Sequence, residues 1–144
     1  WSFEMIEVWL PRSVWVRSAE PYVAVNYELW DGRARNPETD GGYYAMRLPV
    51  LEHLSRVGRQ AMVVAVREVT LDYYAPVGVW QVRESVRRAL SSSPVALPRD
   101  ADGLLREMAN RLETSLERIL AESRVLKRLV LPGAKLNAFL NASG

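Results

Sequence analysis

The chain has 144 residues, of which 49% are hydrophobic and 25% are charged, and its formal net charge is +2. These proportions are typical of a globular domain and exclude general disorder. The longest unbroken apolar run, residues 61–66, is too short for a transmembrane helix, which needs about 20 apolar residues.

The composition also excludes several kinds of site. Cysteine is absent, which excludes disulfides, thiolate catalysis and cysteine zinc sites, and one histidine, His53, cannot form a histidine metal cluster. We therefore predict no metal, no cofactor and no assigned catalytic residue. Lys127 and Lys135 are the two lysines among 19 Lys and Arg residues, so 17 are arginines, which bind carboxylates and phosphates with two donors at once.

The first half of the chain predicts two strands, a loop and a helix. Residues 3–10 are rich in apolar side chains and end at Pro11, and residues 22–30 are rich in aromatic and β-branched ones, so both predict strands. Residues 33–42 are polar and predict a loop. The apolar spacing of residues 43–57 predicts a helix that ends at Gly58.

A third strand and a second helix follow. Residues 61–69 predict the strongest strand, and their nearly continuous apolar run indicates burial on both faces. Residues 71–78 predict a loop, and residues 79–90 predict a helix with one apolar face. Three tryptophans are expected in the core: Trp9, Trp30 and Trp80.

The rest of the chain predicts an appendage to this core. Residues 91–99 form a linker, residues 100–131 a long amphipathic helix, and residues 132–144 a flexible tail. The apolar stripe of the long helix consists of Leu105, Met108, Leu112, Leu116, Ile119 and Leu126. The predicted fold class is α+β, with a small, mostly antiparallel sheet of about three strands packed with helices in residues 1–90.

One candidate functional cluster surrounds the end of the third strand. Arg67 and Glu68 point to opposite faces of the strand, so one charge faces inward unless the strand ends there. A buried Glu68 would need a cationic partner, for which Arg47 and Arg83 are the candidates. The full candidate cluster is Arg47, Arg67, Glu68, Tyr73, Tyr74 and Arg83.

Two further features indicate binding to other molecules. Arg83, Arg87 and Arg88 form a basic row on the second helix, and a DNA phosphate would relieve their mutual repulsion. In the tail, Leu136, Phe139 and Leu140 follow helical spacing and form an apolar plug for a partner groove.

Several motifs in order resemble one known family. They are EMIEVWLPRSVW at the start, then GGYYAMRLPVLEHL, GRQAMVVAVREV and YYAPVGVWQVRESVRRAL, which together extend over residues 4–90. This combination resembles the C-terminal domain of the archaeal Nre DNA-repair proteins.

The resemblance implies a function in the archaeal response to DNA damage, in the cytoplasm or at the nucleoid, without an established catalytic residue. Proteins of this family have a zinc motif with cysteines, which this chain lacks, and commonly end in a peptide that binds the sliding clamp. In the tail, Leu136 and Phe139 fit that peptide, whereas Gly133 replaces its glutamine and Leu140 its second aromatic residue. This departure predicts weak or absent clamp binding.

Three hypotheses follow for the function. The first is a non-catalytic DNA-repair domain that binds DNA, a repair partner such as the sliding clamp, or both. The second is a nucleic-acid-processing enzyme that uses Glu68 beside Arg67, Tyr73 and Tyr74. The third is a structural module that forms a homodimer through the exposed stripe of the long helix.

Overall fold

A computed structural model describes residues 1–13, 15–29, 40–75 and 77–130 of the chain. Three strands form one mixed sheet in the order β2-β1-β3. Strand β1 (Ser2–Trp9) runs antiparallel to β2 (Tyr22–Glu28) and parallel to β3 (Met62–Val69). The α+β class and the three strands are as predicted, but one of the two strand pairs is parallel, so the sheet is not mostly antiparallel.

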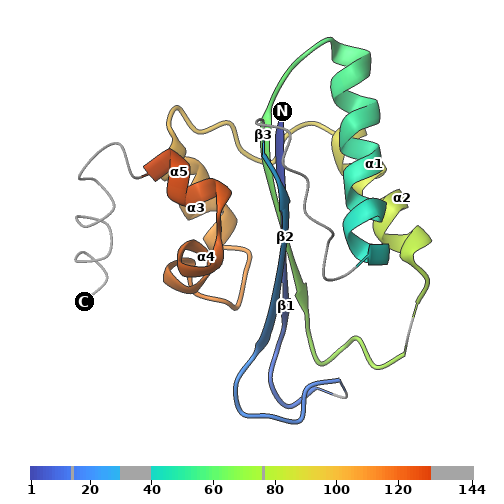
Figure 1. Ribbon diagram of the computed structural model, residues 1–144, viewed down its shortest axis with the longest axis vertical. Coiled ribbons are helices and arrows are strands. Elements are labelled where there is room, and N and C mark those ends of the chain that lie inside the picture. The colour runs from blue at the N-terminus through green and yellow to red at the C-terminus, as the bar shows by residue number, and fades with distance from the viewer. Residues whose placement is uncertain (14, 30–39, 76, 131–144) are drawn as a thin grey trace.

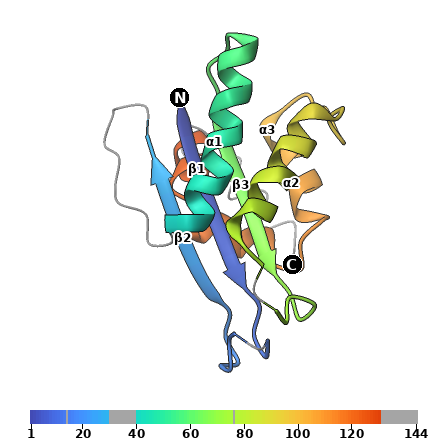
Figure 2. The ribbon, with the colours of Figure 1, turned by 90° about the vertical axis from the view of Figure 1, so that its right-hand side faces the viewer.

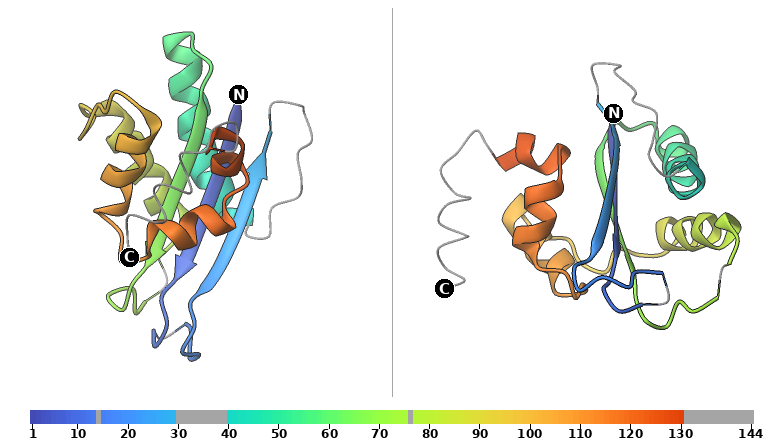
Figure 3. Two further views of the ribbon diagram at one scale, coloured as in Figure 1. Left: turned by 90° about the vertical axis from the view of Figure 1, so that its left-hand side faces the viewer. Right: turned by 60° about the horizontal axis from the view of Figure 1, so that its bottom comes forward.

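Helices cover both faces of this sheet, which makes three layers (Figure 1). Helices α1 (Asp40–Val57) and α2 (Val79–Ser91) cover one face (Figure 2). Helices α3 (Ala101–Ala109), α4 (Leu116–Glu122) and α5 (Val125–Val130) cover the other (Figure 3). Among the helices described, none is long and apolar enough to cross a membrane.

The alternation of side chains along β1 divides the core in two. Phe3 and Met5 pack against α1, together with Tyr43, Met46 and Val50. Ile6 and Val8 point the other way and pack against the C-terminal helices. Because β1 is the middle strand and contributes to both cores, it is more buried than β3. The nearly continuous apolar run that predicted burial on both faces therefore lies on an edge strand.

Helix α1 ends where the sequence predicts it. Gly58 has a positive φ of 63°, a conformation that glycine adopts without steric cost, and its N–H group donates to the carbonyl oxygen of Ser55. The N–H group of Arg59 donates to the carbonyl oxygen of Leu54 in the same turn. The chain thereby leaves the helix and enters β3.

The long helix predicted for residues 100–131 is wrong, because the segment forms three short helices. Asp100 caps α3, and its side chain accepts a hydrogen bond from the N–H group of Gly103. Ser115 caps α4, and Ser123 closes α4 and caps α5, with its Oγ 2.9 Å from the amide nitrogen of Leu126. Each new cap starts a helix in a new direction, so the apolar stripe can follow the sheet.

The residues of the predicted apolar stripe pack inside the domain. Leu105, Leu116, Ile119 and Leu126 are buried in one cluster with Ile6 and Val8, and Met108 and Leu112 pack against it. The stripe that would have formed a homodimer interface is therefore covered by the chain's own sheet. The segment after the linker is a layer of the domain and not an appendage.

A fully buried carboxylate connects this layer to β1. Glu4 accepts hydrogen bonds from the hydroxyl of Ser123 and from the backbone N–H groups of Arg124 and Val125, with a distance of 2.5 Å to the amide nitrogen of Arg124. These N–H groups belong to the start of α5, where a helix has donors without internal acceptors. Glu4 therefore fixes the position of α5 on the sheet.

We predict that Glu4→Gln lowers the free energy of unfolding by about 2–3 kcal/mol. The new NH₂ group faces backbone donors, so at least one of the hydrogen bonds to Glu4 is lost inside the core. Urea denaturation of the variant measures the change, and Glu20→Gln, at an exposed position, is the control. An unchanged denaturation midpoint for Glu4→Gln would contradict this function of Glu4.

Candidate functional site

The first polar group on the α1–α2 side of the sheet is an ion pair whose carboxylate is buried and whose arginine is partly exposed. Glu7 and Arg67 are paired neighbours on β1 and β3, and 2.7 Å separates Arg67 Nη1 from Glu7 Oε2. The other oxygen of Glu7 accepts a hydrogen bond from Trp9 Nε1 at 2.7 Å. A Cβ on Gly42 would lie 3.5 Å from Glu7 Oε2, so the first turn of α1 packs directly on the pair.

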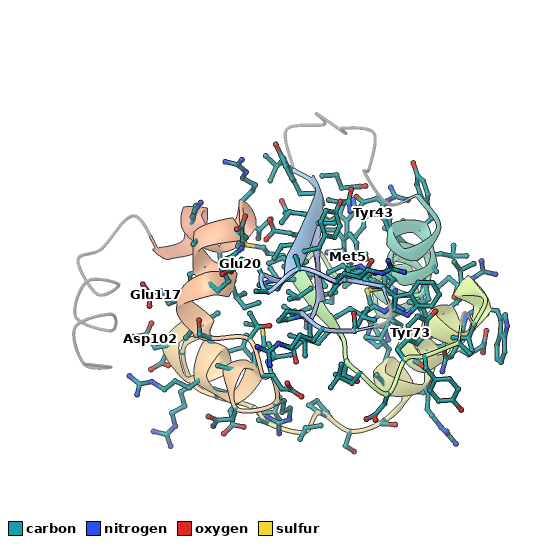
Figure 4. All side chains as sticks on the ribbon, turned by 90° about the horizontal axis from the view of Figure 1, so that it is seen from below. Met5, Glu20, Tyr43, Tyr73, Asp102 and Glu117 are labelled. Carbon is teal, nitrogen blue, oxygen red and sulfur yellow. The ribbon has the colours of Figure 1, made fainter. Side chains whose placement is uncertain are left out.

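Aromatic side chains surround the outer side of this pair. The guanidinium of Arg67 lies 5.6 Å from the ring centre of Tyr73, at a distance typical of a cation–π contact. The Tyr73 ring also contacts the rings of Trp9 and Trp15, and Trp15 Nε1 donates to the Tyr73 carbonyl oxygen at 2.7 Å. Figure 4 shows Tyr73 and Met5 on the same side of the sheet. These contacts hold Arg67 in place.

A second network connects the end of β2 to α1. Glu28 accepts two hydrogen bonds from Arg47, at 2.6 Å and 3.0 Å, and one from the hydroxyl of Tyr43 at 2.9 Å. The guanidinium of Arg47 lies 5.2 Å from the ring centre of Trp1. This two-donor geometry is the one that arginine prefers with a carboxylate.

The network shifts the pKa of each of its members. Burial alone would raise the pKa of Glu28, but the hydrogen bonds from Arg47 and Tyr43 and the charge of Arg47 lower it below 4.5. The hydrogen bond to Glu28 raises the pKa of Arg47. Burial, and then the hydrogen bond to Glu28, raises the pKa of Tyr43. Glu28 and Arg47 are therefore both charged, and Tyr43 is neutral, at neutral pH.

Glu68 lies on the opposite side of the sheet from Arg67. Its two oxygens accept the backbone N–H groups of Glu113 at 2.9 Å and Thr114 at 2.6 Å. These groups lie in the turn before α4, so Glu68 holds that turn on the sheet as Glu4 holds α5. Backbone donors thus take the place of the arginine partner that the sequence predicts.

The structure therefore brings together only part of the predicted cluster. Arg67 and Tyr73 are in contact, whereas Glu68 is on the other face and Arg47 belongs to the Glu28 network. Tyr74, next to Tyr73 in the chain, is 75% exposed. Within the described ranges, no three His, Asp or Glu side chains are placed to hold a metal ion.

The predicted basic row lies on α2, and its three arginines have different environments. Arg87 is held by Glu52 of α1 at 2.9 Å and by Glu84 at 2.7 Å, and the hydrogen bonds to these two residues raise its pKa. Arg83 has a buried Nε atom without a hydrogen-bond partner in the part of the chain that is described. Arg88 is exposed, and it forms no ion pair with any described residue.

A shallow groove runs along the outer face of α2. It has a volume of about 440 Å³ and is lined by Trp80, Gln81, Glu84, Ser85, Arg87, Arg88 and Ser91. Helix α2 has no buried residue, and the indole of Trp80 is 64% exposed. The prediction that Trp80 lies in the core is therefore wrong, and Trp9 is only partly buried.

Three predictions fall wholly outside the described residues. They are the core position of Trp30, the flexible tail at residues 132–144, and the apolar plug formed by Leu136, Phe139 and Leu140. All three stay predictions, as does the sliding clamp as a partner of the tail.

Three carboxylates with partners in the structure were not predicted from the sequence: Glu4, Glu7 and Glu28. The signal for the first two was present, because acidic residues inside an apolar strand must have partners if that strand is central. Their position on the central strand became evident only from the strand order.

The fold and its surface define a small α+β domain with paired carboxylates inside and an exposed polar and aromatic face on α2. The family model described as archaeal Nre, C-terminal, matches residues 28–139. The chain belongs to this family, and the match extends through α3, α4 and α5, beyond the end of the resemblance at residue 90. No solved structure matches the chain.

Curated relatives support the same assignment. The chain is similar to the DNA repair protein NreA of Haloferax volcanii, with 50% identity over 92 residues, and to NreA of Archaeoglobus fulgidus, with 44% over 92 residues. It is also 38% identical to the DNA repair protein NreB of Archaeoglobus fulgidus over 88 residues. The alignments cover 62%, 64% and 61% of this chain but only 22%, 23% and 22% of the relatives. The chain thus matches less than a quarter of each relative.

The Glu28 network predicts a specific dependence of stability on pH. Because the folded-state pKa of Glu28 lies below 4.5, its ionised form stabilises the fold above that pH, and this stabilisation is lost as the pH falls through the folded-state pKa. We expect wild type to have a higher urea midpoint than Glu28→Gln at neutral pH. The difference should shrink as the pH falls below 4.5. A difference that is the same at all pH values would contradict this prediction.

Proposed function

We propose that this chain is a non-catalytic domain of archaeal DNA repair that binds DNA on the outer face of its α1–α2 layer. Its relatives NreA and NreB are named as DNA repair proteins, which supports a function in DNA repair. The α2 groove supports the proposed location of the DNA-binding surface, because an exposed tryptophan and two arginines line it. The protein would then act in the cytoplasm, where archaeal DNA lies.

The charges around this face favour an anionic ligand. The carboxylate of Glu52 on α1 interacts electrostatically with Arg87, Arg83 and Arg56. Arg88 follows Arg87 directly on α2. These four arginines outnumber the two carboxylates among them, Glu52 and Glu84. Such a local excess of positive charge attracts DNA phosphates by releasing their counterions.

The three arginines of the basic row contribute differently to this proposal. Arg87 joins α1 and α2 through its two carboxylate partners, so it stabilises the surface. Arg88 is exposed and lines the groove, so it is the better phosphate ligand, whereas the Nε of Arg83 is buried. Arg88 is therefore the main proposed phosphate contact, and Arg83 adds positive charge on the same helix.

The geometry gives less support to an enzyme that uses Glu68. Both oxygens of Glu68 hold the turn before α4, and Arg67 is bound by Glu7 on the other face. A general acid or base needs a free oxygen within hydrogen-bond reach of a substrate. Glu68 instead stabilises the packing of the C-terminal helices.

We predict that Arg83→Gln/Arg88→Gln weakens DNA binding and makes it less dependent on salt. The slope of log affinity against log salt should fall by roughly one unit for each lost phosphate contact. Fluorescence anisotropy with a labelled oligonucleotide at several salt concentrations measures both quantities. The matched control is Arg111→Gln/Arg118→Gln, which removes the same charge from the opposite layer.

If both affinity and slope stay unchanged in the Arg83→Gln/Arg88→Gln variant, this face does not bind DNA phosphates. If the control variant causes the same loss, the effect comes from net charge alone and the proposed location is wrong. Thermal melting of both variants shows whether they are folded.

A further inference from the structure

The most unusual surface feature of the α1–α2 layer is a group of large apolar side chains at the start of α2. Trp80 and Tyr74 are 64% and 75% exposed, and Val77 and Val79 between them are also exposed. Large aromatic side chains that stay exposed are candidate recognition residues. Of these residues, Trp80 lines the α2 groove together with Arg87 and Arg88.

The indole of Trp80 is held in place from below. A Cβ on Gly78 would lie 2.7 Å from Trp80 Cδ1 and 3.1 Å from its Nε1, so the edge of the indole rests against the backbone of Gly78. A side chain at position 78 would displace the ring from this position. A ring that is supported on one side and exposed elsewhere loses little freedom when a ligand stacks on it.

The groove combines this ring with positive charge at a fixed distance. Trp80 lies at its start and Arg88 two helical turns later, about 12 Å along the axis at 1.5 Å per residue. Glu84 also lines the groove, but Arg87 donates to its carboxylate at 2.7 Å. Arg87 and Arg88 outnumber Glu84 in the lining of the groove, and Arg88 has no ion-pair partner among the described residues.

We infer that the preferred ligand of this groove is single-stranded DNA, with an unpaired base stacked on Trp80 and a nearby phosphate bound by Arg88. The inference rests on the proposed DNA-binding function. Aromatic platforms beside basic grooves bind single strands of any sequence, because every base has a π-face. In a duplex both faces of an internal base are already stacked, so Trp80 would gain nothing from duplex DNA.

The test compares Trp80→Ala with wild type on a labelled oligo-dT and on a duplex of equal length, by fluorescence anisotropy. Wild type should bind the single strand more tightly than the duplex. Trp80→Ala should weaken single-strand binding by about 5- to 150-fold and leave duplex binding unchanged. Trp80→Phe keeps a stacking ring and should retain most of the affinity. Tyr22→Ala, at a 54% exposed aromatic residue on β2, should have no effect.

Equal binding of the two DNA forms, with no effect of Trp80→Ala, would overturn the inference. If Arg83→Gln/Arg88→Gln still weakens binding in that case, the proposed function stands without stacking. If wild type binds neither DNA form, both the inference and the proposed function are wrong. If Trp80→Ala instead abolishes self-association in light scattering and leaves single-strand binding intact, the apolar group is an interface between copies and the inference fails.

Discussion

Strand β1 lies between two other strands and beneath helices on both faces, so its carboxylates have almost no exposure to water. An unpaired buried carboxylate is too costly for a folded protein, and each therefore needs a partner from a neighbouring element. Glu4 takes its partners from the start of α5, and Glu7 takes Arg67 from β3. The two helical layers are positioned around these requirements, with α1 packed on the Glu7 pair and α5 on Glu4.

Residues that stabilise this domain can be distinguished from residues that are free to bind a ligand by whether their charges have partners within the chain. Glu4, Glu7, Glu28 and Glu68 all have partners within the chain. Glu7 joins β1 to β3, and the other three join the sheet to the helical layers. Interior carboxylates whose hydrogen-bond partners lie within the chain stabilise the fold, and they are poorly placed to interact with a substrate. The outer face of α2 differs, because its large aromatic side chain is exposed and part of its positive charge has no partner among the described residues. Ligand binding is therefore expected there.

Local patterns in the sequence were sufficient to predict most helices and strands, but not how these elements are arranged in space. Alternation and helical spacing correctly predicted β1, β2, β3, α1 and α2, because these signals depend on neighbouring residues. The long C-terminal helix was wrong because Ser115 and Ser123 are capping residues, and the partners that fix the new helices, Glu68 and Glu4, are distant in sequence. Strand order and the exposure of Trp80 likewise depend on contacts between distant segments. The family, in contrast, was identified correctly from the motifs alone.

DNA is proposed to bind on the outer face of α2 and not on the C-terminal helical layer. Photo-crosslinking with a single-stranded oligonucleotide that contains bromodeoxyuridine, followed by mass spectrometry of the digested protein, distinguishes these two surfaces. Adducts are expected on peptides that carry Trp80 or Arg88, and they should be lost under excess unlabelled single strand. Adducts confined to α3, α4 and α5 would show that DNA binds the opposite layer.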